Sequence, residues 1–256
     1  MKLALFSLLL LGFQTFGVVA FDASHARYGR ILAAHVTNGA VDYPALKAAP
    51  GELVAYLSEL GAVGETEFNG WNRPAQIAFL INLYNASTLR LIVDHYPVDS
   101  IRRIGGLFGS PWSLKCVRLF DRDVSLNYLE HQFLRPRYKE PRIHFALVCA
   151  ARSCPPLRGE PFLGSRLEDQ LNDQGIRFFS QADKNRVDPK SNTLWLSPIF
   201  DWYGGDFPRE PNRLAEFVSR FLPKRIGDEL CAGSYRVRYT SYDWALNRQE
   251  PAPSTR

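Results

Sequence analysis

The segment PAQIAFLINLYNASTLRLIVDH, residues 74–95, decides the fold. Its apolar side chains fall on all sides of a helix instead of one stripe, a pattern typical of a helix that is covered on several sides. Asn72 precedes the segment as a helix cap, Pro74 suits the first turn, and Pro97 follows its end. The sequence therefore predicts a long central helix around which the rest of the chain packs.

Shorter predicted elements surround this helix. Two amphipathic helices precede it, at residues 24–36 and 51–60. Helices dominate the first half of the chain and strands concentrate in the second. This predicts an α+β fold in which a helical first half packs on a small antiparallel sheet from the second half. The later predicted elements are strands at 114–119, 123–125 and 143–148, a helix at 127–134, a helix at 167–182, a hairpin of 185–188 and 193–196, a helical turn at 198–203, a helix at 211–222 and a strand at 234–240.

Residues 1–20 have the order of a signal peptide: Lys2, then an apolar run, then small residues up to Ala20. Gly12 and Gln14 interrupt the run too early for a membrane anchor of about 20 residues. We expect cleavage after Ala20, a single globular domain over residues 21–248 and a flexible tail at 249–256. The mature protein is then periplasmic or secreted, with no transmembrane segment.

Charge and histidine spacing exclude several kinds of partner. The net charge of +5 falls to +4 without the leader, because Lys2 is the only charged residue there. Lys and Arg are spread along the chain, so we expect no nucleic-acid partner. The five histidines show no metal-site spacing. We therefore expect no metal site and no cofactor.

Four cysteines lie in the predicted mature chain: Cys116, Cys149, Cys154 and Cys231. In an oxidising compartment this even number permits two disulfides. Their spacing alone leaves all three pairings open.

Four segments, in order along the chain, resemble the signature stretches of the family called domain of unknown function 547. They are FLINLYNA (79–86), LNYLEHQFLR (126–135), HFALVCAARSCPPL (144–157) and YDWALN (242–247). The resemblance runs from about residue 43 to 247 and implies no agreed reaction. The family's central positions correspond here to Asn82, Asn85, Glu130, His131, Cys149, Ser153 and Pro155. Cys116 and Cys231 lie outside these stretches, so the resemblance favours a disulfide between them.

These residues suggest cysteine-dependent chemistry. Cys149 begins a loop of small and polar residues, where a nearby histidine can lower a thiol pKa. We predict Cys149 as nucleophile, His131 as base and Glu130 as its orienting carboxylate, in a hydrolase or acyl transferase acting on an amide or peptide-like carbonyl. The substrate is an unspecified small molecule or peptide, and the sequence does not indicate an oligomeric state. The predicted binding residues are Asn82, Asn85, His144, Ser153 and Asp243, and His144 is also the reserve base.

Structural roles remain open for the same residues. Cys149 can instead be a core residue or form a disulfide with Cys154. Glu130 stands three residues after Asn127, the spacing of a capping box. Asn82 and Asn85 can hold neighbouring backbone in place. Asp243 can likewise anchor a turn.

Two other functions therefore remain possible, and the sequence leaves open whether the protein is an enzyme. One is a non-catalytic binding or scaffold domain of the cell envelope. The other is a thiol-redox module, although the four residues between Cys149 and Cys154 exceed the two-residue gap of thioredoxin-type motifs.

Overall fold

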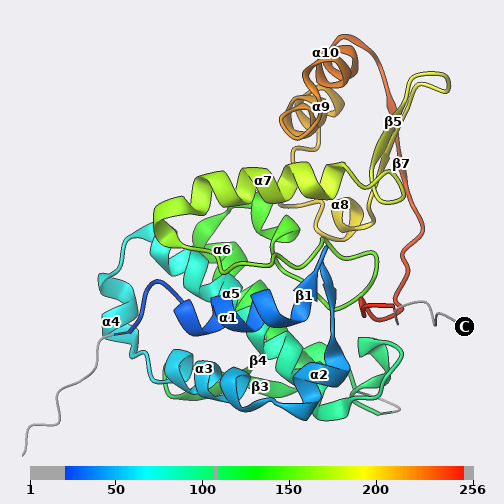
Figure 1. The fold of residues 1–256 in the computed structure, drawn as a ribbon. Coiled ribbons are helices and arrows are strands. Elements are labelled where there is room, and N and C mark those ends of the chain that lie inside the picture. Colours follow the sequence, from blue (N-terminus) through cyan, green and yellow to red (C-terminus); the bar gives the residue numbers. More distant parts are fainter. Residues whose placement is uncertain (1–20, 107–108, 251–256) are drawn as a thin grey trace, which may run out of the picture.

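The computed structural model describes residues 21–106 and 109–250 (Figure 1). The predicted signal peptide and residues 251–256 of the predicted tail lie outside the described residues. Gln249, at the start of that tail, is held by the body of the protein. Its backbone N–H donates to Val41 O at 3.0 Å, and its side-chain amide donates to His35 O at 3.1 Å.

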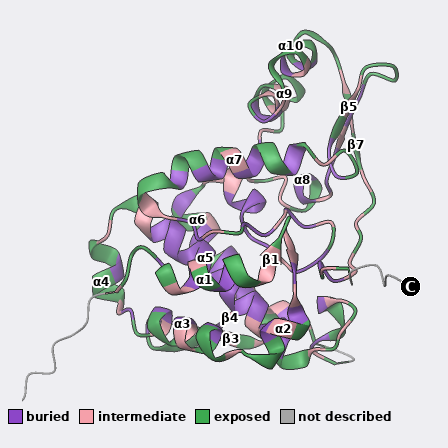
Figure 2. Cartoon of the chain, viewed as in Figure 1, coloured by how far each residue is buried: buried purple, intermediate pink, exposed green. Residues whose placement is uncertain are grey.

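The predicted central helix is confirmed as α5 (Arg73–His95). The Asn72 side chain accepts a hydrogen bond from Ala75 N at 2.9 Å, so it caps the helix. Buried residues follow one another along nearly the whole of α5, and Figure 2 shows it inside the molecule. A helix that is apolar on all sides is thus surrounded by the rest of the chain.

The first helices pack around α5. Helices α2 and α3 both contact α5, and α1 packs on α3. The two amphipathic helices predicted before the central helix are confirmed as α1 and α3, whereas α2 and α4 were not predicted. A helix as short as α4, with Phe68 as its only buried residue, has too few apolar positions to show a period. These helices are α1 (Ala26–His35), α2 (Tyr43–Ala48), α3 (Gly51–Gly61) and α4 (Glu65–Gly70).

The strands form three small sheets, and the α+β class is confirmed. Strands β1 (Val36–Thr37) and β2 (Ala40–Val41) form one antiparallel pair, and β3 (Lys115–Leu119) and β4 (Arg122–Ser125) form another. The third sheet has the order β5-β6-β7. Its β5 and β6 are antiparallel, whereas β7 lies parallel to β6 because helices separate the two in sequence. Its strands are β5 (Arg186–Asp188), β6 (Thr193–Leu196) and β7 (Arg236–Tyr239).

The strand predicted at residues 143–148 is wrong. This buried segment begins as the 3₁₀ helix η4 (Pro141–Phe145) and continues without a strand partner. The Asn85 side chain takes the place of a neighbouring strand. Its amide donates to Ala146 O at 2.9 Å, and its carbonyl oxygen accepts from Val148 N at 2.9 Å.

The helix predicted at residues 127–134 is present, but in an unusual form. It is the π-helix η3 (Tyr128–Leu134), which leads directly into α6 (Arg135–Tyr138). Pro136 in α6 has no N–H to donate, which interrupts the regular α-helical pattern at this junction. Glu130 and His131 both lie in η3, and π-helical turns frequently occur at functional sites.

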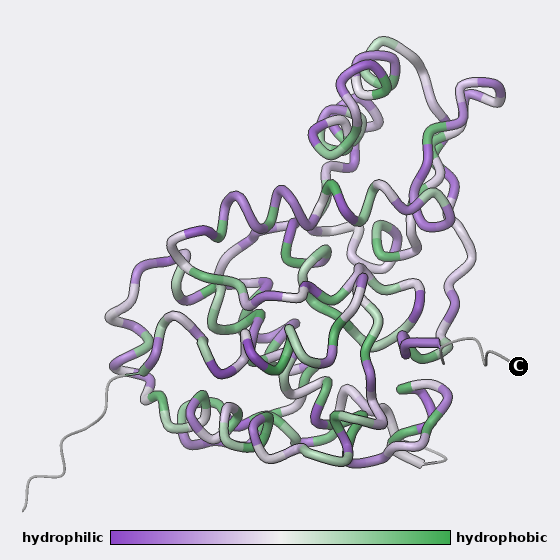
Figure 3. Tube along the Cα trace, in the orientation of Figure 1, coloured by the Kyte–Doolittle hydropathy of each residue, from purple (hydrophilic) through white to green (hydrophobic). Residues whose placement is uncertain are grey.

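The rest of the second half is built on a cluster of phenylalanines. Helix α7 lies across the body, and α9 and α10 project beyond it (Figure 1). Both projecting helices mix hydrophilic and hydrophobic residues, as Figure 3 shows. None of the described helices combines the length and apolar character needed to cross a bilayer. The remaining elements are η1 (Ile101–Arg103), η2 (Pro111–Ser113), η5 (Gly164–Arg166), α7 (Leu167–Phe179), α8 (Ile199–Trp202), α9 (Pro211–Ser219) and α10 (Lys224–Ala232).

Candidate functional site

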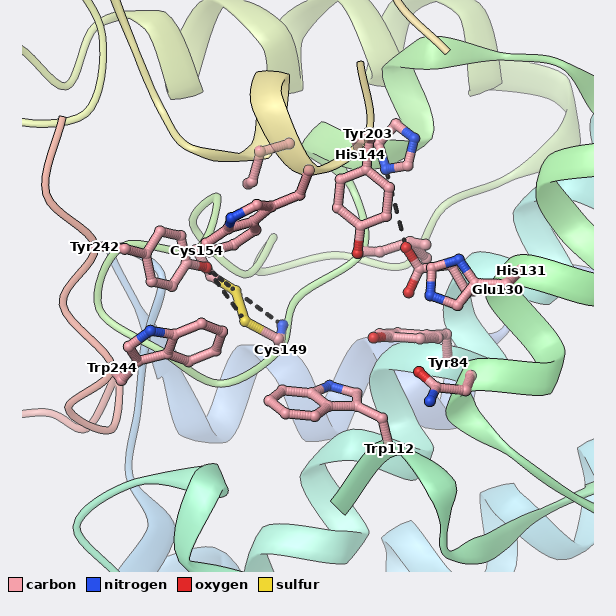
Figure 4. A pocket seen from close by; sticks show the side chains of 14 residues that line it. Tyr84, Trp112, Glu130, His131, His144, Cys149, Cys154, Tyr203, Tyr242 and Trp244 are labelled. Carbon is pink, nitrogen blue, oxygen red and sulfur yellow. Dashed lines mark hydrogen bonds and ion pairs between the residues drawn. A yellow bond between two sulfur atoms is a disulfide. The ribbon is translucent and has the colours of Figure 1, made fainter. Parts of the chain in front are cut away.

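A cavity of about 330 Å³ brings together parts of the chain that are far apart in sequence. Helix α5, η3, η4, α8, the loop after Val148 and the C-terminal segment each contribute side chains (Figure 4). It is lined by Tyr84, Trp112, Asn127, Glu130, His131, His144, Leu147, Cys149, Cys154, Ile199, Trp202, Tyr203, Tyr242 and Trp244. A mostly apolar pocket with a few converging polar groups is the usual form of a small-molecule site.

A disulfide between Cys149 and Cys154 forms part of one wall. Cys149 is half-buried and Cys154 is buried. The Tyr242 hydroxyl lies 3.3 Å from Cys149 Sγ and 3.2 Å from Cys154 Sγ. Because disulfide sulfurs carry no proton, the hydroxyl is the donor in both contacts. Burial raises the pKa of Tyr242, which keeps this donor protonated.

The disulfide changes two predictions. Cys149 is bonded to Cys154 and is not a free thiol, so it can act as the predicted nucleophile only after reduction, and that role stays a prediction. The Cys116–Cys231 disulfide favoured by the family resemblance is wrong, because both cysteines are free. Cys116 lies half-buried on β3, where burial raises its pKa to about 11, and Cys231 is exposed on α10.

Charged and imidazole groups occupy the opposite side of the cavity (Figure 4). The Asp206 carboxylate accepts hydrogen bonds from His144 Nε2 at 2.7 Å and from Arg135 Nε at 2.6 Å. These two bonds hold the pKa of Asp206 well below its usual range. The other ring nitrogen, His144 Nδ1, lies 3.9 Å from Glu130 Oε1. His144 is therefore a buried imidazole with a carboxylate on each side.

His131 accepts a hydrogen bond from Arg135 through one ring nitrogen. Its Nδ1 lies 2.7 Å from Arg135 Nη1. A guanidinium group can only donate, so Nδ1 accepts and the ring proton is on Nε2. The lone pair that a base requires is thus already used, and His131 is less suited than His144 to the role we predicted for it. No hydrogen bond joins either ring to Cys149 among the described residues.

Glu130 is almost fully buried beside two phenols. Only 4% of the residue is exposed, although it lines the cavity. Burial raises the pKa of Tyr84 and Tyr203, and the negative charge of Glu130 raises both further. Tyr203 also stacks on the His144 ring with their centroids 4.0 Å apart. These contacts fix the acidic end of the cavity.

The other predicted site residues do not line this cavity. Asn82 donates to Phe162 O at 2.8 Å and accepts from Phe162 N at 3.0 Å, and Asn85 holds the 146–148 backbone in the same way. Ser153 Oγ accepts from Asp243 N at 2.8 Å. Asn85 and this pair hold backbone next to the lining residues Leu147, Cys154 and Tyr242, whereas Asn82 fixes the segment at Phe162.

Several lining residues were not predicted. Tyr84, Tyr242 and Trp244 lie inside the family motifs, so aromatic residues in these motifs were a signal for all three. Trp112, Trp202 and Tyr203 lie outside every quoted motif. Only the fold places them at the cavity.

One comparison with known proteins gives a match. The family described as "Protein of unknown function, DUF547" matches residues 68–179. This stretch contains Glu130, His144 and the disulfide, but not Tyr203, Asp206 or the Tyr242 and Trp244 rings. No curated protein and no solved structure matches the chain. Residues 68–179 therefore belong to the family of proteins of unknown function DUF547.

Proposed function

We propose that the cavity is the active site of a cysteine-dependent enzyme that carries out thiol–disulfide exchange, with the Cys149–Cys154 bond as its oxidised form. The observation that carries this proposal is the place of the disulfide in the wall of a cavity. Access to a disulfide is one of the factors that set the rate of exchange.

The two sulfurs have different roles in this reaction. A substrate thiolate attacks the Sγ of Cys149, the more exposed of the two cysteines. The S–S bond breaks, and its electron pair leaves on Cys154 Sγ. The Tyr242 hydroxyl, 3.2 Å away, donates a hydrogen bond to this thiolate. A second substrate thiol then attacks the mixed disulfide and releases Cys149. Two electrons and two protons pass from the substrate dithiol to the protein, and the reverse sequence reduces a substrate disulfide.

A second candidate is hydrolysis or acyl transfer by the reduced form. The observation that favours it is the place of His144 and Glu130 in the same cavity as Cys149. After reduction, the Cys149 thiolate would attack an amide or thioester carbonyl, and His144 would protonate the leaving group. His144 replaces His131 in this scheme because the His131 lone pair faces Arg135.

Two single variants separate the candidates. Dithiol exchange requires both sulfurs, whereas acyl transfer requires only Cys149. We expect Cys149→Ser and Cys154→Ser both to lose the dithiothreitol-driven reduction of insulin, a standard disulfide substrate. The control Cys231→Ser, an exposed cysteine on α10, should behave as the wild type.

Hydrolysis of p-nitrophenyl acetate by the reduced proteins tests the second candidate, for which the two variants should differ. Activity that survives in Cys154→Ser and disappears in Cys149→Ser would favour acyl transfer. If the wild type has neither activity, the cavity is not a cysteine active site, and the binding or scaffold function is the better description.

We also propose that the protein works outside the cytoplasm, in an oxidising compartment. The support is the signal-like order of residues 1–20, together with a cavity disulfide that such a compartment would keep formed. N-terminal sequencing of the protein from its native host should begin at Phe21. A protein that retains Met1 and remains in the cytoplasm would contradict the proposal.

A further inference from the structure

We infer that the cavity recognises an organic cation, such as a substituted ammonium group. This inference names the ligand class of the proposed active site and rests on that assignment of the cavity. It concerns binding alone, so it can succeed or fail separately from the exchange reaction.

The first support is a continuous aromatic wall. Trp202 lies 4.8 Å from Tyr242 and 5.6 Å from Trp244, measured between ring centroids. Trp112 continues the wall at 5.8 Å from Trp244. The faces of aromatic rings attract cations, and tryptophan does so most strongly. Several rings beside one space are the arrangement that binds quaternary ammonium groups.

The second support is the charge of the lining. Glu130 is the one carboxylate among the described lining residues, and none of them is Lys or Arg. Among the described residues, Glu130 Oε1 has one ion-pair contact, with His144 Nδ1 at 3.9 Å, and this distance is too long for a hydrogen bond. The neighbouring Arg135 is already paired with Asp206. The hydroxyls of Tyr84 and Tyr203 lie beside Glu130, and Arg135 acts on it electrostatically, but no Lys or Arg forms an ion pair with it among the described residues. A buried carboxylate without an ion pair favours a ligand that brings a positive charge.

The third support is the exposure of the wall. Trp202 remains 48% exposed, although it lines the cavity and packs on two other rings. An exposed tryptophan in such a wall gains contact area when a ligand covers it. Arg102 already lies over Trp244, with Cζ 5.3 Å from the ring centroid. One ring of this wall therefore already holds a cation.

The test compares two probes of nearly equal shape. Choline carries a trimethylammonium group, and 3,3-dimethylbutan-1-ol is its neutral counterpart. Calorimetry and tryptophan fluorescence on the oxidised full chain should show choline binding at least tenfold more tightly. Equal affinity for the two probes, or no binding of either one, would overturn the inference.

Two variants locate the site. Glu130→Gln should weaken choline binding about tenfold and leave the neutral alcohol unchanged. Trp202→Ala, at an exposed position, should weaken choline more than the alcohol, and it decides the question if Glu130→Gln does not fold. The control Asp121→Asn removes an exposed carboxylate at a turn with φ of 58°, which Asn tolerates, and should bind choline as the wild type does. Unchanged choline affinity in a folded Glu130→Gln or in Trp202→Ala would reject this site, whatever the insulin assay shows.

Discussion

At the scale of single residues, Asn85 has the clearest structural role. It is buried in α5, and its side chain binds both Ala146 O and Val148 N. Asn85→Ala leaves two buried backbone groups without partners, and each costs roughly 1–3 kcal/mol. We therefore expect the free energy of unfolding to fall by about 2–6 kcal/mol in urea titrations. Asn212→Ala, at an exposed position of α9, should change it by less than about 0.5 kcal/mol. Equal effects of the two changes would contradict the role assigned to Asn85.

Tyr242 tests the chemistry at the same scale. Tyr242→Phe keeps the ring and removes the hydroxyl that contacts both sulfurs. A hydrogen bond to a charged group contributes roughly 1.5–3 kcal/mol, so reduction of the disulfide by glutathione should slow by about ten- to a hundredfold. Thiol release followed by mass mapping measures this rate. Tyr239→Phe, on β7, serves as the control because Tyr239 is partly exposed and does not line this cavity. A Tyr242→Phe rate equal to that of the wild type would show that the hydroxyl does not assist the leaving thiolate.

At the scale of elements, helix α7 depends on a glycine. A Cβ atom added to Gly175 would lie 2.3 Å from Phe221 Cδ1. That ring cannot move freely because it packs on Phe145, Phe179 and Phe217. Overpacking in Gly175→Ala should cost roughly 1–3 kcal/mol, whereas the better helix propensity of Ala returns about 1 kcal/mol. Because the ring cannot move freely, we expect the cost to exceed the gain and the variant to be less stable than the wild type.

Thermal denaturation of three variants checks this. Gly51→Ala, on α3 with open space around the added atom, should be neutral or slightly stabilising. Adding Phe221→Leu to Gly175→Ala should recover part of the lost stability if the clash is the cause. If the stability losses of Gly175→Ala and Phe221→Leu simply add, the clash with Phe221 is not the cause of the loss in Gly175→Ala.

The elements that the sequence predicted well are those with a strong local signal. Helix α5 has a cap, a first-turn proline and a long apolar run, and the β5–β6 hairpin has alternation with a turn between its strands. The segment 143–148 failed because an apolar run looks the same in a strand and in a buried irregular segment. What distinguishes them is Asn85, a residue 61 positions away from its partner Ala146.

The candidate site was predictable only in part, for the same reason. Motif residues indicated Glu130, His144 and Cys149, which all line the cavity. Their pairing was not predictable, because His131 is occupied by Arg135 and Cys149 by Cys154. The aromatic wall depends on α8 and the C-terminal segment approaching η2, which local patterns do not encode.

At the scale of the whole molecule, two hydrophobic clusters meet at η4. Ile143 belongs to the cluster around α5, and Phe145 belongs to the phenylalanine cluster below α9. His144, between them, is held at the edge of the cavity by Asp206. The cavity thus lies where the two halves of the core join, a common position for ligand sites.

The pH dependence of global stability follows in part from His25, a histidine that does not line the cavity. His25 is buried, and its Nδ1 lies 2.6 Å from the Tyr56 hydroxyl. Burial lowers the pKa of His25 to about 4 in the folded protein, below its ordinary value of about 6.5. Between these values the unfolded chain binds a proton that the folded protein does not. Stability is therefore fully present above pH 6.5 and is lost as the pH falls toward 4.

The matched variant is His25→Asn. Asn tolerates the φ of 50° at this position and keeps a polar group near Tyr56, but it does not titrate. Urea titrations of the wild type should show about 2–3 kcal/mol lost between pH 7 and pH 4.5 from this group alone. The free energy of unfolding of His25→Asn should fall less over this pH range, by the amount that His25 contributes. The carboxylates contribute equally to the pH dependence of both proteins. If the two slopes coincide, His25 becomes protonated without opening the α1–α3 contact, and the acid sensitivity of the fold has another origin.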